Sequence, residues 1–387
     1  MTRKLYEEFQ KRFGSCDGAE IYFAPGRVNL IGDHTDYNCG HVFPCALTMG
    51  TYAVARKRAD RKIRLFSMNF AKTGIIESSL EDLVPGENGG WSDYPKGVFW
   101  AFFQYGYEIP YGMDLLLYGN IPNGAGLSSS ASLEVLVGYI LNDFLGFRIK
   151  NEELAKIGQY AENHYNGMNC GIMDQFAVAM GKKQYGIFLN TTTLDYQYVP
   201  IVLDDVRLVI ACSNKKRKLT DSKYNERRSQ CETALERIQK IKTIKTLGEL
   251  TIDEFYEVRG AICDEVLERR AMHAVTENQR TIQAVAALQK NDMETFGALM
   301  SKSHVSLRDN YEVTGKELDT LVEVAWEQEG VLGSRMTGAG FGGCTVTLVK
   351  KDAVQAFIQK TGTAYEKAIG YPADFYSVEI GDGPRKV

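Results

Sequence analysis

The sequence predicts a protein of two domains that combine strands with helices. Its 387 residues exceed the size at which a single hydrophobic core usually stops growing, so two cores are expected. Apolar runs bounded by turn residues predict a series of strands before residue 213, and helical periodicity dominates residues 252–300 and 315–328. Hydrophobic residues make up 44% of the chain and charged residues 24%, which is the balance of a soluble globular protein.

Composition and charge argue against several classes of function. The formal net charge of −4 gives no general electrostatic reason to bind nucleic acid. No uncharged apolar run approaches the length of a membrane span, and residues 1–9 predict a charged amphipathic helix rather than a signal peptide. The cysteines show no C-x-x-C or zinc-like spacing, so we expect them to be reduced; they stand at positions 16, 39, 45, 170, 212, 231, 263 and 344. We therefore expect a cytoplasmic protein without nucleic-acid, membrane or obligate protein partners.

The first half of the chain predicts mainly strands. A short strand at residues 20–23 is expected to run into a turn-rich loop at residues 24–44. Charged residues flank a turn at residues 59–61 and predict a solvated hairpin tip. The further elements expected here are strands at 48–58, 63–69, 74–78 and 113–118, and a helix at 98–105.

Helices become more frequent after residue 130. A helix at residues 131–145 is apolar around most of its circumference and should be buried. Asn151 is expected to cap the next helix, which ends at Asn166-Gly167. Further strands are expected at 185–190, 196–202, 207–212 and 345–349, and a helix at 229–240. We expect the domain boundary near residue 200, which gives domains at 1–200 and 201–387.

A loop rich in glycine and serine, residues 119–132, lies between an expected strand and an expected helix. Gly124 and Gly126 allow a sharp turn and a close approach of the backbone to a ligand. The serines can cap the helix, whose free N–H groups would then face an anion. This pattern fits a phosphate cradle, and taken alone it also fits an ordinary capped core helix.

Two other segments carry polar residues that suggest chemistry. Arg27, Asp33, His34 and Asp36 crowd the loop at residues 24–44, where they could bind a polyhydroxylated ligand or simply form a solvated turn. One His and two Asp make a poor dedicated metal site. Asp174 stands in a weakly charged loop and is a candidate general base, although a structural Asp is the commoner outcome.

A basic run and a glycine-rich run complete the candidate segments. Residues 215–228 are rich in Lys and Arg around Tyr224, which fits a solvated face or one that attracts a phosphorylated ligand. Residues 338–343 formally match the dinucleotide fingerprint, but they precede an expected strand instead of a helix. The chain has no Walker A sequence.

Three ordered motifs resemble those of the GHMP small-molecule kinase superfamily. Residues 26–38 (GRVNLIGDHTDYN) resemble the galactokinase signature specifically, and residues 122–132 and 336–344 resemble the second and third motifs. Further similar segments are 171–175, 224–228, 273–278 and 303–304. The resemblance spans nearly the whole chain.

The resemblance implies an α+β fold of two domains with the active site in the cleft between them. It implies transfer of the γ-phosphoryl of ATP, with Mg²⁺, to the C1 hydroxyl of α-D-galactose, the reaction that begins galactose breakdown by the Leloir pathway. Phosphoryl transfer needs positioning and charge neutralisation more than covalent help.

The resemblance also implies a role for individual residues. Asp174 matches the catalytic Asp that accepts the sugar hydroxyl proton, and Arg27 the Arg that pairs with it. The expected sugar contacts are Asp33, His34, Thr35, Asp36 and Tyr224. The expected ATP contacts are Ser67, Gly124, Ala125, Gly126, Leu127, Ser128, Ser129 and Ser130. Ser130 and Glu162 match the Mg²⁺ ligands, and Mg²⁺ suits such oxygen ligands.

Two departures leave alternatives open. The signature usually has Glu where this chain has Asp33, and the stretch before Tyr224 usually has His where this chain has Arg217. A kinase for N-acetylgalactosamine shares the three motifs. A non-catalytic galactose sensor is a further alternative, although known sensors lack the Ser-Ala pair that Ser130 and Ala131 form here.

Overall fold

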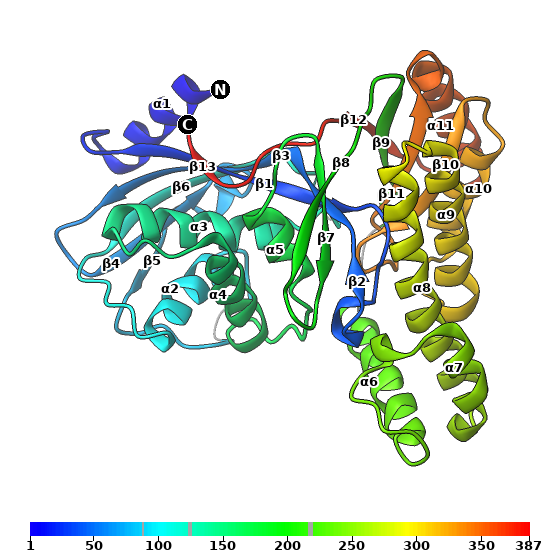
Figure 1. Cartoon of the computed structure of the whole chain (residues 1–387). Helices are drawn as coiled ribbons and strands as arrows, with labels where there is room; N and C mark the ends of the chain where they lie inside the picture. Colours follow the sequence, from blue (N-terminus) through cyan, green and yellow to red (C-terminus); the bar gives the residue numbers. More distant parts are fainter. Residues whose placement is uncertain (87–88, 123–125, 216–219) are drawn as a thin grey trace.

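The computed structural model describes residues 1–86, 89–122, 126–215 and 220–387, with the side chains of 220–222 left out. Two lobes lie side by side, each built on its own sheet (Figure 1). The α+β class expected above is confirmed. Within the described residues, none of the helices is both long and apolar enough to cross a membrane.

The first lobe contains a six-stranded sheet in the order β13-β1-β3-β6-β4-β5. The β4–β6 pair is parallel, and the other pairs are antiparallel. Its strands are β1 (Glu20–Asn29), β3 (Pro44–Lys57), β4 (Lys62–Ser67), β5 (Ile76–Ser79), β6 (Met113–Gly119) and β13 (Arg385–Lys386). Its helices are α1 (Thr2–Phe13), α2 (Asp93–Gln104), α3 (Ser129–Leu145), α4 (Asn151–His164) and α5 (Met173–Ala179).

Alternation of side chains along β6 divides the core of this lobe into two layers. Leu115 and Leu117 point to the face covered by α2 to α5, whereas Leu116 packs under α1 on the opposite face (Figure 1). Phe9 and Phe13 of α1 complete the second layer. This packing fixes α3 against the sheet, because nine residues of the helix are buried.

The second lobe contains a four-stranded antiparallel sheet in the order β10-β11-β9-β12. Its strands are β9 (Val206–Cys212), β10 (Val331–Thr337), β11 (Cys344–Lys350) and β12 (Asp374–Val378). Its helices are α6 (Thr220–Ile238), α7 (Ile252–Val258), α8 (Glu265–Gln289), α9 (Met293–Ser306), α10 (Lys316–Trp326) and α11 (Val354–Ile369). A small sheet of β2 (His41–Val42), β7 (Tyr185–Asn190) and β8 (Tyr196–Pro200) stands between the lobes (Figure 1). The short helical turns are Asp36–Asn38, Ala71–Thr73, Leu247–Glu249, Arg259–Ile262, Leu307–Tyr311 and Lys351–Ala353.

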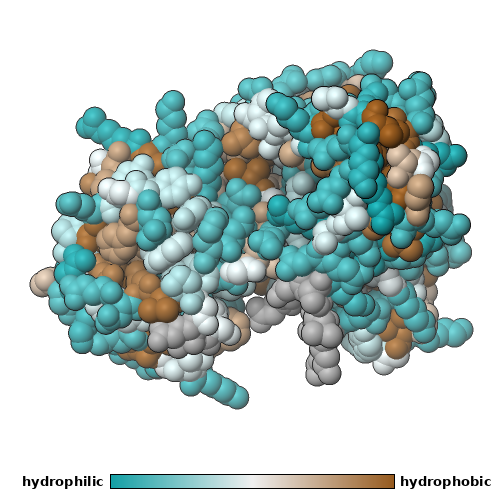
Figure 2. Space-filling view, turned by 90° about the horizontal axis from the view of Figure 1, so that it is seen from below, coloured by the Kyte–Doolittle hydropathy of each residue, from teal (hydrophilic) through white to brown (hydrophobic). Residues whose placement is uncertain are grey.

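One hydrophobic cluster joins the two lobes. Leu30 and Phe43, from the segment after β1, pack in the same cluster as Ile210 of β9 and Leu288 and Phe296 of α8 and α9. The chain end also returns to the first lobe, where Tyr22 of β1 pairs with Lys386 of β13. Both chain termini therefore lie together beside α1 (Figure 1). The surface seen from below is mainly hydrophilic, and its apolar side chains form scattered groups (Figure 2).

The expected short strand at residues 20–23 is longer than predicted, because β1 continues to Asn29. A register shift between Pro25 and Arg27 interrupts its pairing with β3 and lets the strand continue through the proline. Gly26 is required at this shift, because a Cβ there would lie 2.8 Å from Ile121 Cδ1 and 2.9 Å from the Leu127 carbonyl oxygen. The backbone of β1 thereby lies directly against the loop that follows β6.

Candidate active site

The loop between β6 and α3 leads into a helix N-terminus suited to an anion. Of this segment, Gly124 and Ala125 lie outside the described residues. Gly126 has φ 73° and Ser128 φ 59°, so the chain turns sharply into α3. No side chain of the described residues caps the helix. Its first N–H groups and its dipole therefore remain available to a negatively charged ligand.

The residues expected to contact ATP differ in how exposed their side chains are. Ser129 is exposed and Ser130 is partly exposed at the start of α3. The side chain of Leu127 is buried in the core, and its carbonyl accepts the backbone N–H of Arg27 at 3.2 Å. Ser67 ends β4 beside Leu117 of β6 and is 5% exposed.

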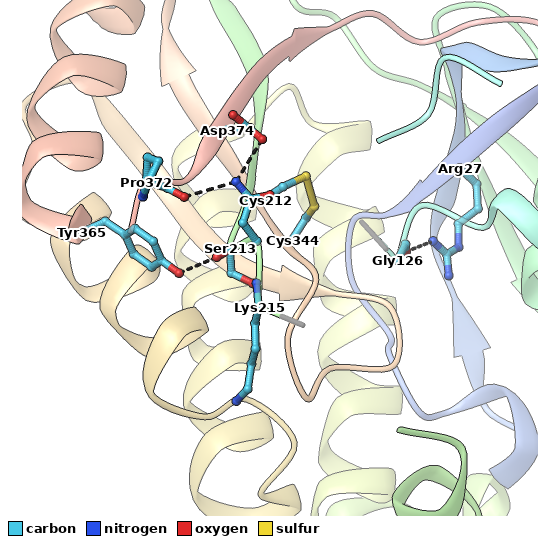
Figure 3. The surroundings of a disulfide bond; sticks show 10 residues. Arg27, Gly126, Cys212, Ser213, Lys215, Cys344, Tyr365, Pro372 and Asp374 are labelled. Carbon is cyan, nitrogen blue, oxygen red and sulfur yellow. Dashed lines mark hydrogen bonds between the residues drawn. A yellow bond between two sulfur atoms is a disulfide. The ribbon is translucent and has the colours of Figure 1, made fainter. Parts of the chain in front are cut away.

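Arg27 connects this loop with Asp174. Its Nη1 donates to the Gly126 carbonyl at 2.8 Å, which Figure 3 shows. Its Nε and Nη2 donate to Asp174 Oδ1 at 2.8 and 2.7 Å. The side chain of Arg27 is 4% exposed, whereas that of Asp174 is 30% exposed. Arg27 therefore fixes one oxygen of the carboxylate, and the Asp174 side chain remains partly exposed.

Ser128 holds the second oxygen of the Asp174 carboxylate. Its hydroxyl donates to Asp174 Oδ2 at 2.5 Å, so this serine is oriented toward Asp174 rather than toward the helix end. Asp174 stands in the first turn of α5. The bonds from Arg27 and Ser128 fix its orientation from two separate segments of the chain.

A cluster of buried carboxyl groups lies behind Asp174, where α3, α4 and α5 meet. Gln175 Nε2 donates to Glu134 Oε2 at 2.9 Å and to Glu162 Oε2 at 2.5 Å. Burial, followed by the nearby charge of Asp174, raises the pKa of Glu162 to about 7. Burial, followed by the charge of Glu162, raises the pKa of Glu134 well above its usual value. A hydrogen bond from Ser130 opposes the shift at Glu162.

These groups fit a hard divalent cation. Glu134 Oε1 and Gln175 Oε1 are buried acceptors without a partner among the described residues. The part of the chain that the structure describes holds no group of three or more His, Cys, Asp or Glu side chains that could bind a metal by itself. Such a sparse set of oxygens suits Mg²⁺, which usually completes its coordination with water and phosphate oxygens.

His34 begins a chain of hydrogen bonds among aromatic residues. Its Nδ1 lies 2.7 Å from the Tyr37 hydroxyl, which lies 2.8 Å from the Tyr311 hydroxyl. The Tyr224 ring lies 5.5 Å from the imidazole, centroid to centroid. Burial, followed by the charge of His273, lowers the pKa of His34 to about 3. The imidazole is therefore neutral, and its buried Nε2 has no partner among the described residues.

Asp36 lies across the backbone of Gly171. A Cβ at Gly171 would overlap the Asp36 carboxylate, so the loop before α5 can approach Asp36 only with glycine there. Burial, followed by the charge of Asp174, raises the pKa of Asp36 to about 6. Burial, followed by the charge of Asp36, also raises the pKa of Tyr224, and the charge of Asp174 contributes, so the three groups from separate segments lie near one another.

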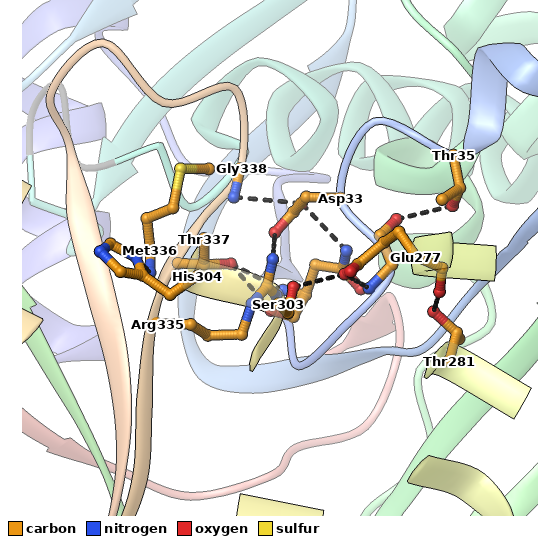
Figure 4. Close-up of polar contacts among 12 residues, drawn as sticks. Asp33, Thr35, Glu277, Thr281, Ser303, His304, Arg335, Met336, Thr337 and Gly338 are labelled. Carbon is orange, nitrogen blue, oxygen red and sulfur yellow. Dashed lines mark hydrogen bonds and ion pairs between the residues drawn. The ribbon is translucent and has the colours of Figure 1, made fainter. Parts of the chain in front are cut away.

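Asp33 and Thr35 are bonded to protein groups, Asp33 to the second lobe and Thr35 to its own loop. Asp33 is 1% exposed and forms an ion pair with Arg335 at 2.6 Å, as Figure 4 shows. Burial raises the pKa of Asp33, and the nearby charge of Arg335 and a bond from Asn29 oppose that rise. Thr35 is fully buried, and its hydroxyl lies 2.8 Å from the Gly32 carbonyl and 2.7 Å from the His41 carbonyl. The polar atoms of both residues therefore bond to protein partners, and their contact with a sugar stays a prediction.

Helix α8 supplies three residues to which sequence reasoning gave no role. His273 Nε2 lies 3.1 Å from the Asp33 carbonyl, and Asn278 Oδ1 accepts the His41 N–H at 2.8 Å. Glu277 accepts the Gly32 N–H at 3.0 Å (Figure 4). Burial opposes ionisation of Glu277, but Arg280, His273 and Arg335 hold its pKa at about 2. The available signal was their spacing, which places three polar side chains on one buried helix face.

The glycine-rich loop at residues 338–343 joins β10 to β11, as expected for a loop that enters a strand. At its end the expectation of reduced cysteines is wrong for one pair, because Cys212 and Cys344 form a disulfide (Figure 3). The two residues are 132 positions apart and become direct neighbours through the β9–β11 register. Spacing along the sequence could not reveal that pairing. Of the basic run, Arg217 lies outside the described residues.

Comparisons with known proteins agree on one family. The model described as "Galactokinase galactose-binding signature" matches residues 7–57, "GHMP kinases N terminal domain" matches 93–182 and "GHMP kinases C terminal" matches 284–367. A galactokinase from Clostridium beijerinckii is 56% identical over 99% of this chain and 98% of that protein. One from Lactiplantibacillus plantarum is 53% identical over the whole length of both chains.

Solved structures give the same result. The crystal structure of Lactococcus lactis galactokinase complexed with galactose matches with a TM-score of 0.98 and 48% identity, over 100% of both chains. The mevalonate kinase of Methanococcus jannaschii matches with a TM-score of 0.66 and 17% identity, over 94% of this chain and 98% of that chain. The second match shows a shared fold alone.

Proposed function

Because the chain belongs to the galactokinase family of ATP-dependent sugar kinases, we propose that it transfers the γ-phosphoryl of ATP to the C1 hydroxyl of α-D-galactose. The products are galactose 1-phosphate and ADP. The observation that supports this most strongly is the bond set of Asp174, held by Arg27 and Ser128 beside the N-terminus of α3. The Asp174 carboxylate, which could accept a hydroxyl proton, therefore lies beside the helix N-terminus that could bind phosphate.

In the proposed reaction the C1 hydroxyl of galactose donates a hydrogen bond to Asp174. The proton passes to that carboxylate while the C1 oxygen forms a bond to the γ-phosphorus and the bond to the leaving ADP breaks. Arg27 keeps Asp174 oriented and places positive charge beside the transferring phosphoryl group. Since the geometry is held before substrate arrives, most of the proposed advantage is positioning.

The nucleotide would occupy the loop before α3 and the end of β4. Residues proposed to contact ATP are Ser67, Gly124, Ala125, Gly126, Leu127, Ser128, Ser129 and Ser130. Ser130 and Glu162 would hold Mg²⁺, which neutralises charge on the phosphates when it is bound. The unpartnered oxygens of Glu134 and Gln175 beside Glu162 support a cation there.

The sugar would lie between the loop of residues 26–44 and α6. His34 and Asp36 are proposed to accept or donate hydrogen bonds to its hydroxyls, with Tyr224 against the ring. Neutral His34 can donate or accept depending on the tautomer, with the Ala339 backbone also close to its ring. Asp33 and Thr35 are proposed to act through the shape of the loop, because their polar atoms already bond to protein partners.

Three broader statements belong to the same proposal. The domains are taken as residues 1–200 and 201–387, with the site between them. The protein is taken to work in the cytoplasm. It is taken to act on galactose and Mg-ATP without a nucleic-acid, membrane or obligate protein partner.

The proposal is tested by ADP release with Mg-ATP and each of galactose, N-acetylgalactosamine, glucose, arabinose and mevalonate. Strong turnover confined to galactose is the expected result. Preference for N-acetylgalactosamine would reassign the enzyme to that sugar, and binding of galactose without turnover would indicate a sensor. Either result would overturn the proposed function.

Asp174→Asn tests the assigned chemistry. The amide keeps the size of the side chain but cannot take up the hydroxyl proton, so kcat should fall by roughly 10²-fold or more. Galactose binding, measured by calorimetry, should remain detectable. Wild-type kcat in this variant would contradict the role given to Asp174.

A further inference from the structure

We infer that Arg335 is a positioning residue for sugar binding, and that its ion pair with Asp33 links the sugar loop, residues 29–41, to Gly126 at the start of the described part of the phosphate loop, residues 126–130. The inference rests on the proposed function. It assigns a buried residue of the second lobe to the site, although neither Arg335 nor Asp33 is exposed to a ligand.

Both oxygens of Asp33 are already satisfied by the protein. Arg335 Nη2 donates to Oδ2 at 2.6 Å, and Oδ1 accepts from Asn29 Nδ2 at 2.9 Å and from the Gly338 N–H at 3.3 Å. Asp33 is 1% exposed and Arg335 is fully buried. A carboxylate used in this way has no free face for a sugar hydroxyl, so its effect on the sugar must pass through the backbone that it anchors.

Arg335 bonds to two residues at the beginning of the sugar loop. Besides the pair with Asp33, its Nη1 donates to the Asn29 carbonyl at 3.2 Å. Thr337 adds a hydroxyl that donates to the same carbonyl at 2.9 Å and accepts the Asn29 N–H at 3.1 Å (Figure 4). The segment from Asn29 to Asp33 is therefore fixed to the end of β10, immediately before His34.

The same contacts reach the phosphate loop through Gly338. Its N–H bonds to Asp33, and a Cβ on it would lie 2.8 Å from the Gly126 carbonyl oxygen and 3.7 Å from Arg27 Nη2. Gly126 and Arg27 in turn bond to each other. Asp33 therefore contacts the turn that packs on the phosphate loop, so one ion pair sets the spacing of two binding loops.

The Asp33–Arg335 ion pair should affect the position of the sugar loop more than the overall stability of the protein. A buried ion pair adds little stability compared with well-packed apolar residues, but removing one partner leaves an uncompensated buried charge. The segment must then shift to solvate or rebond that charge. Because His34 follows Asp33 directly, such a shift moves a proposed sugar contact.

The test measures galactose affinity by calorimetry on the full-length wild-type protein and on variants. Arg335→Gln should raise the Kd for galactose roughly tenfold or more, within the range of coupling seen between contacting residues. Arg335→Lys, which keeps the charge, should raise it less. The double variant of Asp33→Asn with Arg335→Gln should show a smaller rise than the product of the two single effects.

Arg64→Gln serves as the matched control. Arg64 donates to the buried Asp114 at 2.7 and 3.0 Å on the six-stranded sheet, away from both loops. The Arg64→Gln variant should lower the melting temperature, as we also expect of Arg335→Gln, but it should leave the Kd for galactose unchanged. If Arg335→Gln does not fold, Arg335→Lys and Asp33→Asn carry the same comparison.

Three results would overturn the inference. They are a Kd within twofold of wild type for Arg335→Gln, single effects that multiply in the double variant, and a rise in Kd for Asp33→Asn that neither Arg335 variant shows. The last would mean that Asp33 touches the sugar directly. Failure of the wild-type protein to bind galactose would instead refute the proposed function, so the two failures are distinguishable.

Discussion

Asp36 shows how a single residue can serve a site at the expense of stability. Burial, followed by the charge of Asp174, raises its pKa from 3.8 to about 6. A carboxyl group whose pKa is raised on folding stabilises the fold fully below pH 3.8, and that contribution is lost as the pH rises through 6. At neutral pH the ionised Asp36 therefore destabilises the free enzyme.

The first prediction concerns Asp36→Asn, which removes this titration. The free energy of unfolding of the variant minus that of wild type should increase by about 2–3 kcal/mol as the pH rises from 4 to 8, which corresponds to the size of the pKa shift. It should also bind galactose more weakly. Urea unfolding at several pH values provides the measurement. A stability difference that does not change with pH would contradict the cause assigned to the shift.

The sequence named the residues of the candidate site, but it could not show the partners of their polar atoms. The sequence placed Asp33, His34, Thr35 and Asp36 on one loop. In the structure the polar atoms of Asp33 and Thr35 bond to protein partners, whereas the Asp36 carboxylate lies against Gly171. The partner of Asp33 is Arg335, 302 residues later. Only the three-dimensional packing decides which carboxylate is neutralised by a distant cation.

At the scale of elements, α8 acts as a support for the sugar loop. His273, Glu277 and Asn278 each bond to that loop or to the strand that follows it. Asn278 bonds to both the backbone N–H and the ring of His41, and to the Gly248 carbonyl. The helix thereby fixes the loop through three separate side chains.

The second prediction is that Asn278→Ala raises the KM for galactose and lowers the free energy of unfolding by about 1 kcal/mol, because it leaves partly buried backbone groups unpaired. Asn142→Ala is the matched control. Asn142 also makes two bonds to a backbone, with the N–H and carbonyl of Ile149, and it lies far from the sugar loop in the chain. It should lower stability and leave the KM unchanged; an equal rise in KM for both variants would refute the support role.

Element prediction from the sequence was most successful where local signals were strong. The apolar strand at residues 113–118 and the helix at 131–145 agree with β6 and α3. Asn151, expected to cap α4, instead lies in its first turn and donates to the Ala179 carbonyl. The basic residues expected at a solvated hairpin tip include Arg56, Arg58 and Arg64, which all pair with the buried Asp114. These differences depend on partners from distant strands, which local patterns do not contain.

At the scale of the whole molecule, the two lobes share part of their interior. The cluster that contains Leu30, Phe43, Ile210 and Leu288 has members from both lobes. The C-terminal strand β13 adds hydrogen bonds between the end of the chain and β1. Separation of the lobes would expose this apolar surface, which is unfavourable in water.

The third prediction is that the whole chain unfolds in one cooperative transition despite its two sheets. Differential scanning calorimetry should show a single peak with equal calorimetric and van't Hoff enthalpies. Galactose with a non-hydrolysable ATP analogue should move that peak to higher temperature, because both ligands bind only the folded protein. Two separated peaks would show that the shared cluster does not couple the lobes.

Asp174, Arg27 and the N-terminus of α3 are proposed to direct a phosphoryl group from ATP to C1 of galactose. Phosphorus-31 NMR of the full-length protein with Mg-ATP and galactose identifies the phosphorylated position. We expect one new phosphomonoester signal coupled to the anomeric proton, with matching loss of the ATP γ-phosphorus signal. A product phosphorylated at another carbon, or inorganic phosphate alone, would contradict it.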